Sequence, residues 1–445
     1  MYKPLLALFG RFSSLLGARV AGAICMFAVN LLVARVFGLE VLGVFALYLA
    51  GTGLLAVFLS AGFNSVIVFF AAEYAARKQP GLIKGFLKAS GWHVAAGTAL
   101  VCLVLAIGLP AAGGQLPDYA AHLAVQTVLS AVALSGVLLN GGLMVALKHQ
   151  FRGLAPETLI RPVLLLAAVL ILIVAAPQAG LNAVLWLATG AMWAGLAVSL
   201  IWSRRLLQPI LQAKADTENR RWRRAAYPWI PVSLLWDYLI DLMILAAGLF
   251  AGAEEVAILH ICFRFRVLSG FGMRAIYALL IPELAELKTQ GKYAKLRLRL
   301  TQANWAALAY ASAVLLFFAV AGAQLLSLFG RDAGEGHLIL LIICLTLPVR
   351  AVFGPAPAIL ALNDQYMISA VVMIAGCMAG MVLAVVLYPP FQVAGYAIGY
   401  TMANLAVSAG LWKVVQQRTG INCSVFQRFD VREIIAGRVR SHQET

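Results

Sequence analysis

The chain has 445 residues, of which 62% are apolar and only 12% are charged, against roughly half and a quarter in an ordinary soluble domain. This composition excludes a soluble globular enzyme. The net charge of +16 does not indicate a nucleic-acid partner, because basic residues of a multi-pass membrane protein gather in its cytoplasmic loops and no nucleic-acid-reading domain fits the sequence.

Long apolar runs, ended by charges, proline or glycine, predict about twelve membrane spans. In chain order they are 14–37, 41–71, 89–109, 121–146, 162–176, 183–203, 229–251, 256–285, 300–329, 337–362, 367–387 and 393–412. These runs are too long and too evenly apolar for barrel strands, and open strands cannot cross lipid with an unpaired backbone. We therefore predict an all-α polytopic membrane protein.

The basic residues predict the orientation of these spans. Alternate segments, including both termini, carry 27 of the 34 Lys and Arg residues, whereas the opposite loops carry only Arg331. Because Lys and Arg concentrate on the cytoplasmic side, we expect both termini to be cytoplasmic. The outer loops are short, so no extracytoplasmic domain is expected.

The longest cytoplasmic segment, 204–228, contains a basic-aromatic run at 220–224 and divides the spans into two sets of six. A faint repeat at an offset of about 214 residues, typical of transporters built from duplicated halves, aligns 38–45 with 252–259. The basic run is explained either by topology or by attraction to anionic head groups. The predicted domains are a six-helix bundle at 1–203, a basic linker at 204–228, a second six-helix bundle at 229–412 and a basic cytoplasmic tail at 413–445.

The main functional signal is a set of arginines inside the predicted spans: Arg19, Arg35, Arg264, Arg266, Arg274 and Arg350. An arginine near the centre of a membrane helix costs at least about 2.5–3.5 kcal/mol, so it usually faces a wet cavity or a partner. Arg35 is close to the outer end of its span and can reach the interface. Arg19 lies near the inner end of the same span, where both interpretations, a cavity residue and an interfacial residue, stay open.

One predicted span carries His260, Arg264, Arg266 and Arg274 within a single crossing. At 100° per residue the first two share one stripe and the last two share another, so a broad polar surface is expected to line an aqueous lumen. A lipid-facing helix would not tolerate this set of charges.

The preceding span carries Asp237 and Asp241, which are expected one turn apart on one face. By depth in an antiparallel pair, Asp237 should lie near Arg274, and Asp241 nearer Arg264 or Arg266. Two interpretations remain open. Either these charges and His260 pair and hold the second half together, or the arginines form a cationic cavity for an anion such as a pyrophosphate, with the acids serving in coupling.

The span at 337–362 contains Pro348, Pro355 and Pro357 together with Gly354. Proline removes a backbone hydrogen bond and kinks a helix, so this span is expected to be broken, as a hinge or as a static kink. The cysteines and histidines are dispersed, and enzyme and nucleotide-binding motifs are absent. We therefore expect no metal, no cofactor and no enzymatic activity, with energy taken from a gradient or from the substrate's own concentration difference.

Residues 30–45 resemble the first-helix signature of polysaccharide-repeat-unit flippases, and 280–287 followed by Gly291 are similar to the end of helix eight in the same proteins. These are the Wzx-type flippases of the multidrug/oligosaccharidyl-lipid/polysaccharide exporter superfamily. The twelve-span plan with short outer loops extends the resemblance over the whole chain.

The resemblance implies a V-shaped pair of bundles with a central cationic cavity. It implies a transporter in the bacterial inner membrane that flips an undecaprenyl-pyrophosphate-linked repeat unit, for O-antigen, capsule or exopolysaccharide, by alternating access. The expected partners are this lipid-linked glycan, membrane lipid, a coupling proton or sodium ion, and polysaccharide polymerase and chain-length proteins. The residues expected to bind substrate are Arg264, Arg266, Arg274, Arg19 and Arg350, with Asp237, Asp241 and His260 in coupling or charge pairing.

Three other protein classes share features with this sequence but match it less well. Lipid II flippases of this superfamily usually have fourteen spans, whereas this chain shows twelve. Multidrug antiporters share the bundle but favour cationic substrates, which intramembrane arginines disfavour. A polymerase or ligase of lipid-linked glycan would carry a large periplasmic loop with catalytic residues, and the outer loops here are short.

Overall fold

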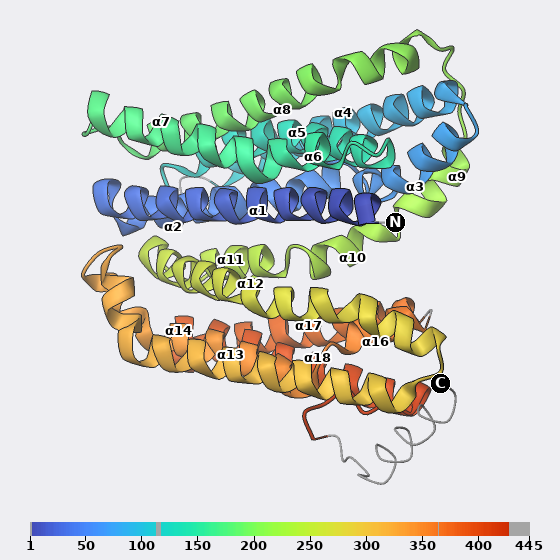
Figure 1. The fold of residues 1–445 in the computed structure, drawn as a ribbon. Coiled ribbons are helices and arrows are strands. Elements are labelled where there is room, and N and C mark those ends of the chain that lie inside the picture. Colours follow the sequence, from blue (N-terminus) through green and yellow to red (C-terminus); the bar gives the residue numbers. More distant parts are fainter. Residues whose placement is uncertain (1, 113–116, 364, 427–445) are drawn as a thin grey trace, which may run out of the picture. The chain divides into compact units, whose positions relative to one another are not determined.

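A computed structural model describes residues 2–112, 117–363 and 365–426. The regular secondary structure within these ranges is helical, without strands, and the predicted all-α fold is confirmed. The chain forms two compact units, residues 1–257 and 258–445, whose helices are labelled in Figure 1. Each unit is described by itself below.

The first unit contains the helices up to the start of α12. They are α1 (Tyr2–Phe37), α2 (Leu39–Leu59), α3 (Phe63–Ala76), α4 (Pro80–Ala111), α5 (Ala120–Ala146), α6 (Gln150–Ala155), the π-helix η1 (Pro156–Ile160), α7 (Arg161–Ala175), α8 (Leu181–Gln212), α9 (Asn219–Ala226), α10 (Trp229–Trp236) and α11 (Leu239–Gly248).

The second unit contains most of α12 and the helices that follow it. They are α12 (Ala253–Thr289), α13 (Tyr293–Ser327), the 3-10 helix η2 (Asp332–Gly336), α14 (His337–Cys344), α15 (Thr346–Phe353), α16 (Ala356–Leu362), α17 (Tyr366–Phe391) and α18 (Val393–Thr419).

The helices are those of a multi-pass membrane protein. Within the described ranges, ten are long and apolar enough to cross a membrane, and an eleventh span results if the bent pair α10 and α11 is counted as one. Each of the twelve predicted spans coincides with one helix or with consecutive helices. The boundaries predicted for the two duplicated halves stay a prediction, because α9 to α11 belong to the first compact unit.

Several spans are broken or extended relative to the sequence prediction. The span predicted at 41–71 ends as α2 at Leu59 and resumes as α3 at Phe63, after Gly62 with φ of 78°. The span predicted at 337–362 breaks at Gly354, where φ is 74° and ψ is −174°, so the break predicted from its prolines is confirmed. The fifth predicted span starts earlier than expected, because α6, η1 and α7 continue from Gln150 to Ala175.

Polar side chains join the helices at the centre of the first unit. Tyr48 on α2, Ser130 on α5 and Thr189 on α8 form a buried triangle, in which Tyr48 Oη lies 2.6 Å from Ser130 Oγ and Ser130 Oγ lies 3.1 Å from Thr189 Oγ1. Further along the same two helices, Asn140 Nδ2 on α5 donates to Ser199 Oγ on α8 at 2.7 Å. Since a buried polar group is costly without a partner, these bonds fix how α2, α5 and α8 face one another.

In the second unit, α17 and α18 form a tightly packed pair. A Cβ placed on Gly380 would lie 2.1 Å from the Cβ of Ala403, and one on Gly399 would lie 2.6 Å from that of Ala384. Glycine at these positions lets the two backbones approach closely. After α18 the chain turns at Gly420 and packs against the break between α15 and α16, where Val425 N donates to Val352 O at 2.9 Å.

Candidate functional site

The helix α12 carries the polar residues singled out from the sequence. Its 37 residues make it about 55 Å long at 1.5 Å per residue, so it exceeds the hydrocarbon thickness of about 30 Å. His260 is 2% exposed, and Arg264, one turn later, donates from Nε to His260 Nε2 at 3.2 Å. The imidazole accepts this bond, so Nε2 presents its lone pair to the guanidinium.

Arg266 is the most informative residue of the site. Its side chain is only 6% exposed, its Nε donates to Thr346 Oγ1 at 3.2 Å, and its guanidinium carbon lies 5.6 Å from the ring centroid of Tyr400. Both partners are neutral. Within the part of the chain that the structure describes, no carboxylate pairs with Arg266, so its positive charge is buried without an opposite charge.

Two further arginines lie around Arg266. Arg350 on α15 is close enough to Arg266 and Arg274 to be repelled by both, and the phenol groups of Tyr277 and Tyr400 also act on it. Arg274 lies with its guanidinium carbon 5.1 Å from the ring centroid of Phe271. The structure therefore brings together three of the predicted arginines, from α12 and α15, within the second unit.

This cluster has the electrostatics of an anion site. Arg350 is repelled by both Arg266 and Arg274, and burial of the Arg266 charge without an opposite charge is costly. Glu283, further along α12, is paired with Arg299 at 2.8 Å. An anion with several oxygens, held by bidentate guanidinium bonds, would remove both penalties at once.

The acids predicted for coupling lie in the first unit, and their expected geometry is wrong. Asp237 and Asp241 do not share one face of a continuous helix, because the chain breaks before α11, and the stretch Asn219–Leu235 is bent by 64° against Leu239–Gly248. Asp237 follows the last residue of α10, and Tyr238 precedes α11 with φ of −117° and ψ of 21°. A tertiary contact accompanies the break: a Cβ on Gly53 of α2 would lie 2.6 Å from the Tyr238 ring.

Sequence reasoning missed two charged residues at the π-helix, Glu157 within η1 and Arg161 at the start of α7. It assigned 147–161 to a cytoplasmic loop, but Glu157 and Arg161 lie within the continuous helical stretch from Gln150 to Ala175. Glu157 is close enough to Asp237 for their carboxylates to repel each other. Pro156 before the acid was the available signal, because proline favours the first turn of a new helical segment, and π-helical turns often occur at functional sites.

The remaining predicted residues are placed as follows. Arg19 is exposed on α1 of the first unit, whereas Arg264, Arg266, Arg274 and Arg350 belong to the second. The predicted pairing of Asp237 and Asp241 with the arginines stays a prediction. Within the described residues no group of histidines, cysteines or carboxylates is arranged to hold a metal ion.

Comparison with known proteins gives one family and one fold. Residues 10–288 match the model of a family described as polysaccharide biosynthesis protein. No curated protein sequence matches the chain.

Solved structures with similar folds have low sequence identity. An inward-facing multidrug resistance transporter of the MATE family has a TM-score of 0.71 at 14% identity, over 89% of this chain and 94% of its own. The lipid II flippase MurJ has a TM-score of 0.70 at 12% identity, over 89% of this chain and 86% of its own. A transporter of the MOP superfamily from Pyrococcus furiosus, whose binding pocket is described as reversed in polarity, has a TM-score of 0.57 at 16% identity, over 91% of this chain and 94% of its own.

Proposed function

Because the chain belongs to the polysaccharide biosynthesis protein family, we propose that it is a flippase rather than an enzyme. It moves an undecaprenyl-pyrophosphate-linked oligosaccharide repeat unit from the inner to the outer leaflet of the bacterial inner membrane, by alternating access. The single observation that carries this proposal is Arg266, a guanidinium buried inside a membrane helix with only neutral partners.

The charge of the cluster selects the substrate class. Arg266, Arg274 and Arg350 repel one another, so the site is most stable when an anion lies among them. A pyrophosphate offers several oxygens to planar guanidinium groups, which bind phosphate bidentately. The tyrosines beside Arg350, Tyr277 and Tyr400, add hydroxyl and ring contacts of the kind that sugars use.

Arg264 and Arg19 take secondary roles in this proposal. Arg264 is paired with His260 and approaches the substrate when the imidazole releases it. Arg19 on α1 contacts acidic groups of the glycan. The prenyl tail stays in lipid, because its burial in a charged cavity would forfeit favourable apolar contacts.

Coupling falls to the acids of the first unit. Asp237 lies at a break between helices, where discontinuous transporter helices commonly bind ions, and Glu157 repels it electrostatically. Two carboxylates in repulsive contact favour uptake of a cation. We therefore assign proton or sodium binding to Asp237 and Asp241, with Glu157 adjusting the affinity.

The experiment uses cells that make the lipid-linked glycan, with and without this gene, and labels the glycan from the periplasmic face. Loss of the gene should trap the repeat unit inside. Arg266→Gln should lower flipping by about ten- to a hundredfold, since a hydrogen bond to a charged group contributes about 1.5–3 kcal/mol. Arg35→Gln removes an equal charge outside the cluster and should leave flipping unchanged.

Membrane abundance and a monodisperse elution profile are measured for both variants, so that misfolding is recognised. If folded Arg266→Gln protein flips at the wild-type rate, the cluster does not bind substrate. If loss of the gene leaves labelling unchanged but abolishes long polymer, a polymerase or ligase replaces the flippase. If no glycan phenotype appears, drug or ion antiport takes its place.

A lipid II flippase is the second candidate, favoured by the fold shared with MurJ and by the fact that lipid II carries the same prenyl pyrophosphate. Depletion of the protein from cells distinguishes a lipid II flippase from a repeat-unit flippase. A lipid II flippase is required for peptidoglycan synthesis, so its depletion should cause lysis, whereas depletion of a repeat-unit flippase should interrupt only the surface glycan.

A further inference from the structure

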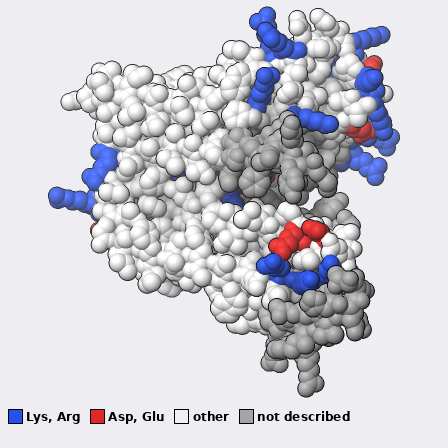
Figure 2. Space-filling model, in the orientation of Figure 1, with Lys and Arg blue, Asp and Glu red and all other residues white. Residues whose placement is uncertain are grey.

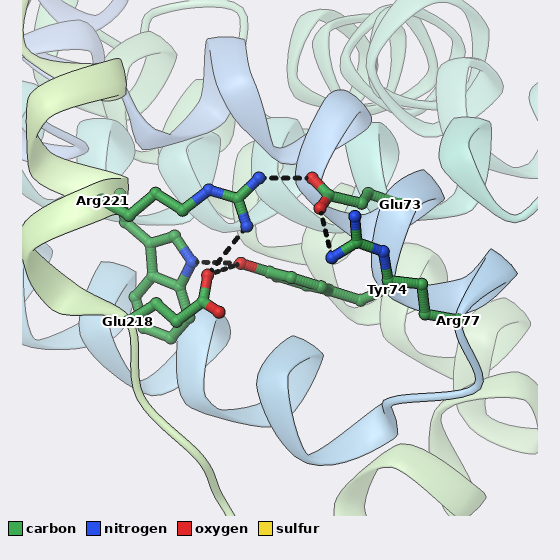
Figure 3. Close-up of polar contacts among 6 residues, drawn as sticks. Glu73, Tyr74, Arg77, Glu218 and Arg221 are labelled. Carbon is green, nitrogen blue, oxygen red and sulfur yellow. Dashed lines mark hydrogen bonds and ion pairs between the residues drawn. The ribbon is translucent and has the colours of Figure 1, made fainter.

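The linker helix α9 is fixed to the first unit by a buried anchor. Trp222 is 0% exposed and donates from Nε1 to Tyr74 Oη at 2.8 Å, and Tyr74 Oη in turn donates to Glu218 Oε2 at 2.7 Å. Gly85 of α4 lets the linker backbone approach closely, because a Cβ there would lie 1.7 Å from the carbonyl oxygen of Asp216 and 3.1 Å from the Trp222 ring. Figure 3 shows these contacts between α3 and the start of α9.

Ion pairs complete the anchor and neutralise its own charges. Arg221 bonds to Glu218 at 3.0 Å and to Glu73 at 2.7 Å, and Glu73 also pairs with Arg77 at 3.0 Å, as Figure 3 shows. Two acids thus balance two arginines. The Arg221 guanidinium also lies over the Phe70 ring, 5.1 Å from its centroid. The position of α9 is therefore set by this cluster and does not depend on the other basic residues of the linker.

The other arginines of α9 are left without acidic partners. Arg220 and Arg224 are exposed and form no hydrogen bond or ion pair among the described residues. They lie four residues apart, so they share one face of the helix, where like charges at this spacing cost about 0.2–0.5 kcal/mol. The anchor holds this unfavourable pair in place.

Both arginines line a surface cavity. Its volume is about 710 Å³, and the lining residues besides Arg220 and Arg224 are Phe70, Thr217, Glu218, Asn219, Arg221 and Ala225. The cavity is shallow and open to the surface, so it suits a group that remains partly exposed when bound. Because Glu218 and Arg221 are paired with each other, the charge that the cavity offers a ligand is that of Arg220 and Arg224.

Exposed aromatic residues follow the cavity in the chain. The chain leaves α9 through Tyr227 and Trp229, which are 43% and 40% exposed, and exposed aromatic residues of this kind favour the membrane interface. In Figure 2 basic side chains gather at the end of the first unit where α8 leads to α9. Aromatic and basic residues together are typical of a protein surface that contacts lipid head groups.

We propose that the α9 cavity binds the phosphate group of a lipid, held by Arg220 and Arg224 with Thr217 and Asn219 as further hydrogen-bond donors. The phosphate belongs either to an anionic membrane phospholipid or to a prenyl pyrophosphate. This site is separate from the arginine cluster of the second unit, and the inference does not depend on the proposed transport function.

The test measures lipid binding to the purified full-length chain by native mass spectrometry and by protection against thermal unfolding. Phosphatidylglycerol and farnesyl pyrophosphate are the two lipid probes, and inorganic pyrophosphate is the soluble probe. The double variant Arg220→Gln/Arg224→Gln should bind the lipid probe about 25-fold more weakly, or about fivefold per arginine at the usual contribution of a basic residue near a membrane surface.

Arg223→Gln is the matched control, because Arg223 lies on the same helix but outside the cavity, where its Nε donates to Asn219 O at 3.3 Å. Its affinity should stay within about twofold of wild type, since only diffuse surface charge is lost. If Arg223→Gln weakens binding as much as Arg220→Gln does, or if the double variant binds normally, the cavity is not a site.

The probes distinguish the two lipid sources. A loss confined to phosphatidylglycerol assigns the site to a membrane phospholipid, and a loss confined to farnesyl pyrophosphate assigns it to a prenyl pyrophosphate. Binding of inorganic pyrophosphate as tight as that of either lipid overturns the proposal, because the phosphate then need not be attached to a lipid. The elution profile and the thermal midpoint without lipid should be unchanged in the double variant, so a folding defect is recognised.

Discussion

Replacement of Gly354 by alanine tests the break between α15 and α16. Gly354 has φ of 74° and ψ of −174°, a region that only glycine occupies readily. A Cβ at this position would lie 2.0 Å from the carbonyl oxygen of Cys423 and 2.9 Å from Nδ2 of Asn304. The same Asn304 amide donates to that carbonyl at 2.7 Å. An added Cβ would therefore displace both partners of the hydrogen bond that holds the segment around Cys423.

The loss of stability expected for Gly354→Ala has two parts. Backbone strain for a non-glycine residue in this region is about 1–3 kcal/mol, and overpacking against fixed atoms adds about 1–3 kcal/mol. Gly38 is a matched control, because its φ of 95° and ψ of 165° lie in the same region while nothing lies within 4 Å of a Cβ placed on it. Gly354→Ala should therefore lose more stability than Gly38→Ala by about 1–3 kcal/mol, the overpacking part alone.

The assay compares the thermal unfolding of the two purified variants in detergent with that of the wild-type chain. Both midpoints should fall, with a larger fall for Gly354→Ala. Hydrogen exchange should also show faster exchange of the Val425 amide, which donates to Val352 O, in Gly354→Ala only. Equal losses of stability in the two variants would refute the contact between Gly354 and Cys423, and an unchanged Gly38→Ala midpoint would refute the strain argument.

Two further predictions concern the first unit. Tyr48→Phe removes the phenol that contacts the hydroxyl of Ser130 at 2.6 Å, so the free energy of unfolding should fall by about 1–3 kcal/mol, measured by the thermal midpoint. Hydrogen bonds from Tyr74 and then Arg221 hold the pKa of Glu218 below its ordinary value. Docking of α9 is therefore fully stabilised above the unfolded-state pKa of Glu218 and weakens as the pH falls through its lower folded-state pKa. Cleavage within α9 by pepsin, which is active at low pH, should accelerate over that acidic window relative to the Glu218→Gln variant, which should show no such dependence.

The sequence alone predicts those residues of the site that are energetically unfavourable in a membrane helix whatever their neighbours are. An arginine in an apolar run is unfavourable in lipid wherever the helix packs, so Arg264, Arg266 and Arg274 were recognisable without any knowledge of their neighbours. The break at Gly354 was recognisable for a similar reason, because proline cannot continue a regular helix. Both features are local, and the structure has both.

Features that depend on long-range contacts were not predictable. The break after Asp237 has no proline or glycine to signal it, and it accompanies the packing of the Tyr238 ring on Gly53. The neutral partners of Arg266, Thr346 and Tyr400, lie far along the chain. Hydrophobic periodicity specifies which face of a helix is buried but does not specify which side chain from another helix meets it.

The neutral surroundings of Arg266 bear on the two interpretations that the sequence left open for the second unit. If its arginines served only to hold helices together, each buried guanidinium would need a carboxylate, since an unpaired buried charge destabilises the fold. Arg266 instead has a hydroxyl and an aromatic ring as partners, and Arg350 is repelled by two other arginines. The proposed anion site is consistent with this arrangement, because a permanent carboxylate would compete with the ligand for the same guanidinium donors. The charge left without a partner in the second unit is therefore the property by which an anionic substrate would be recognised.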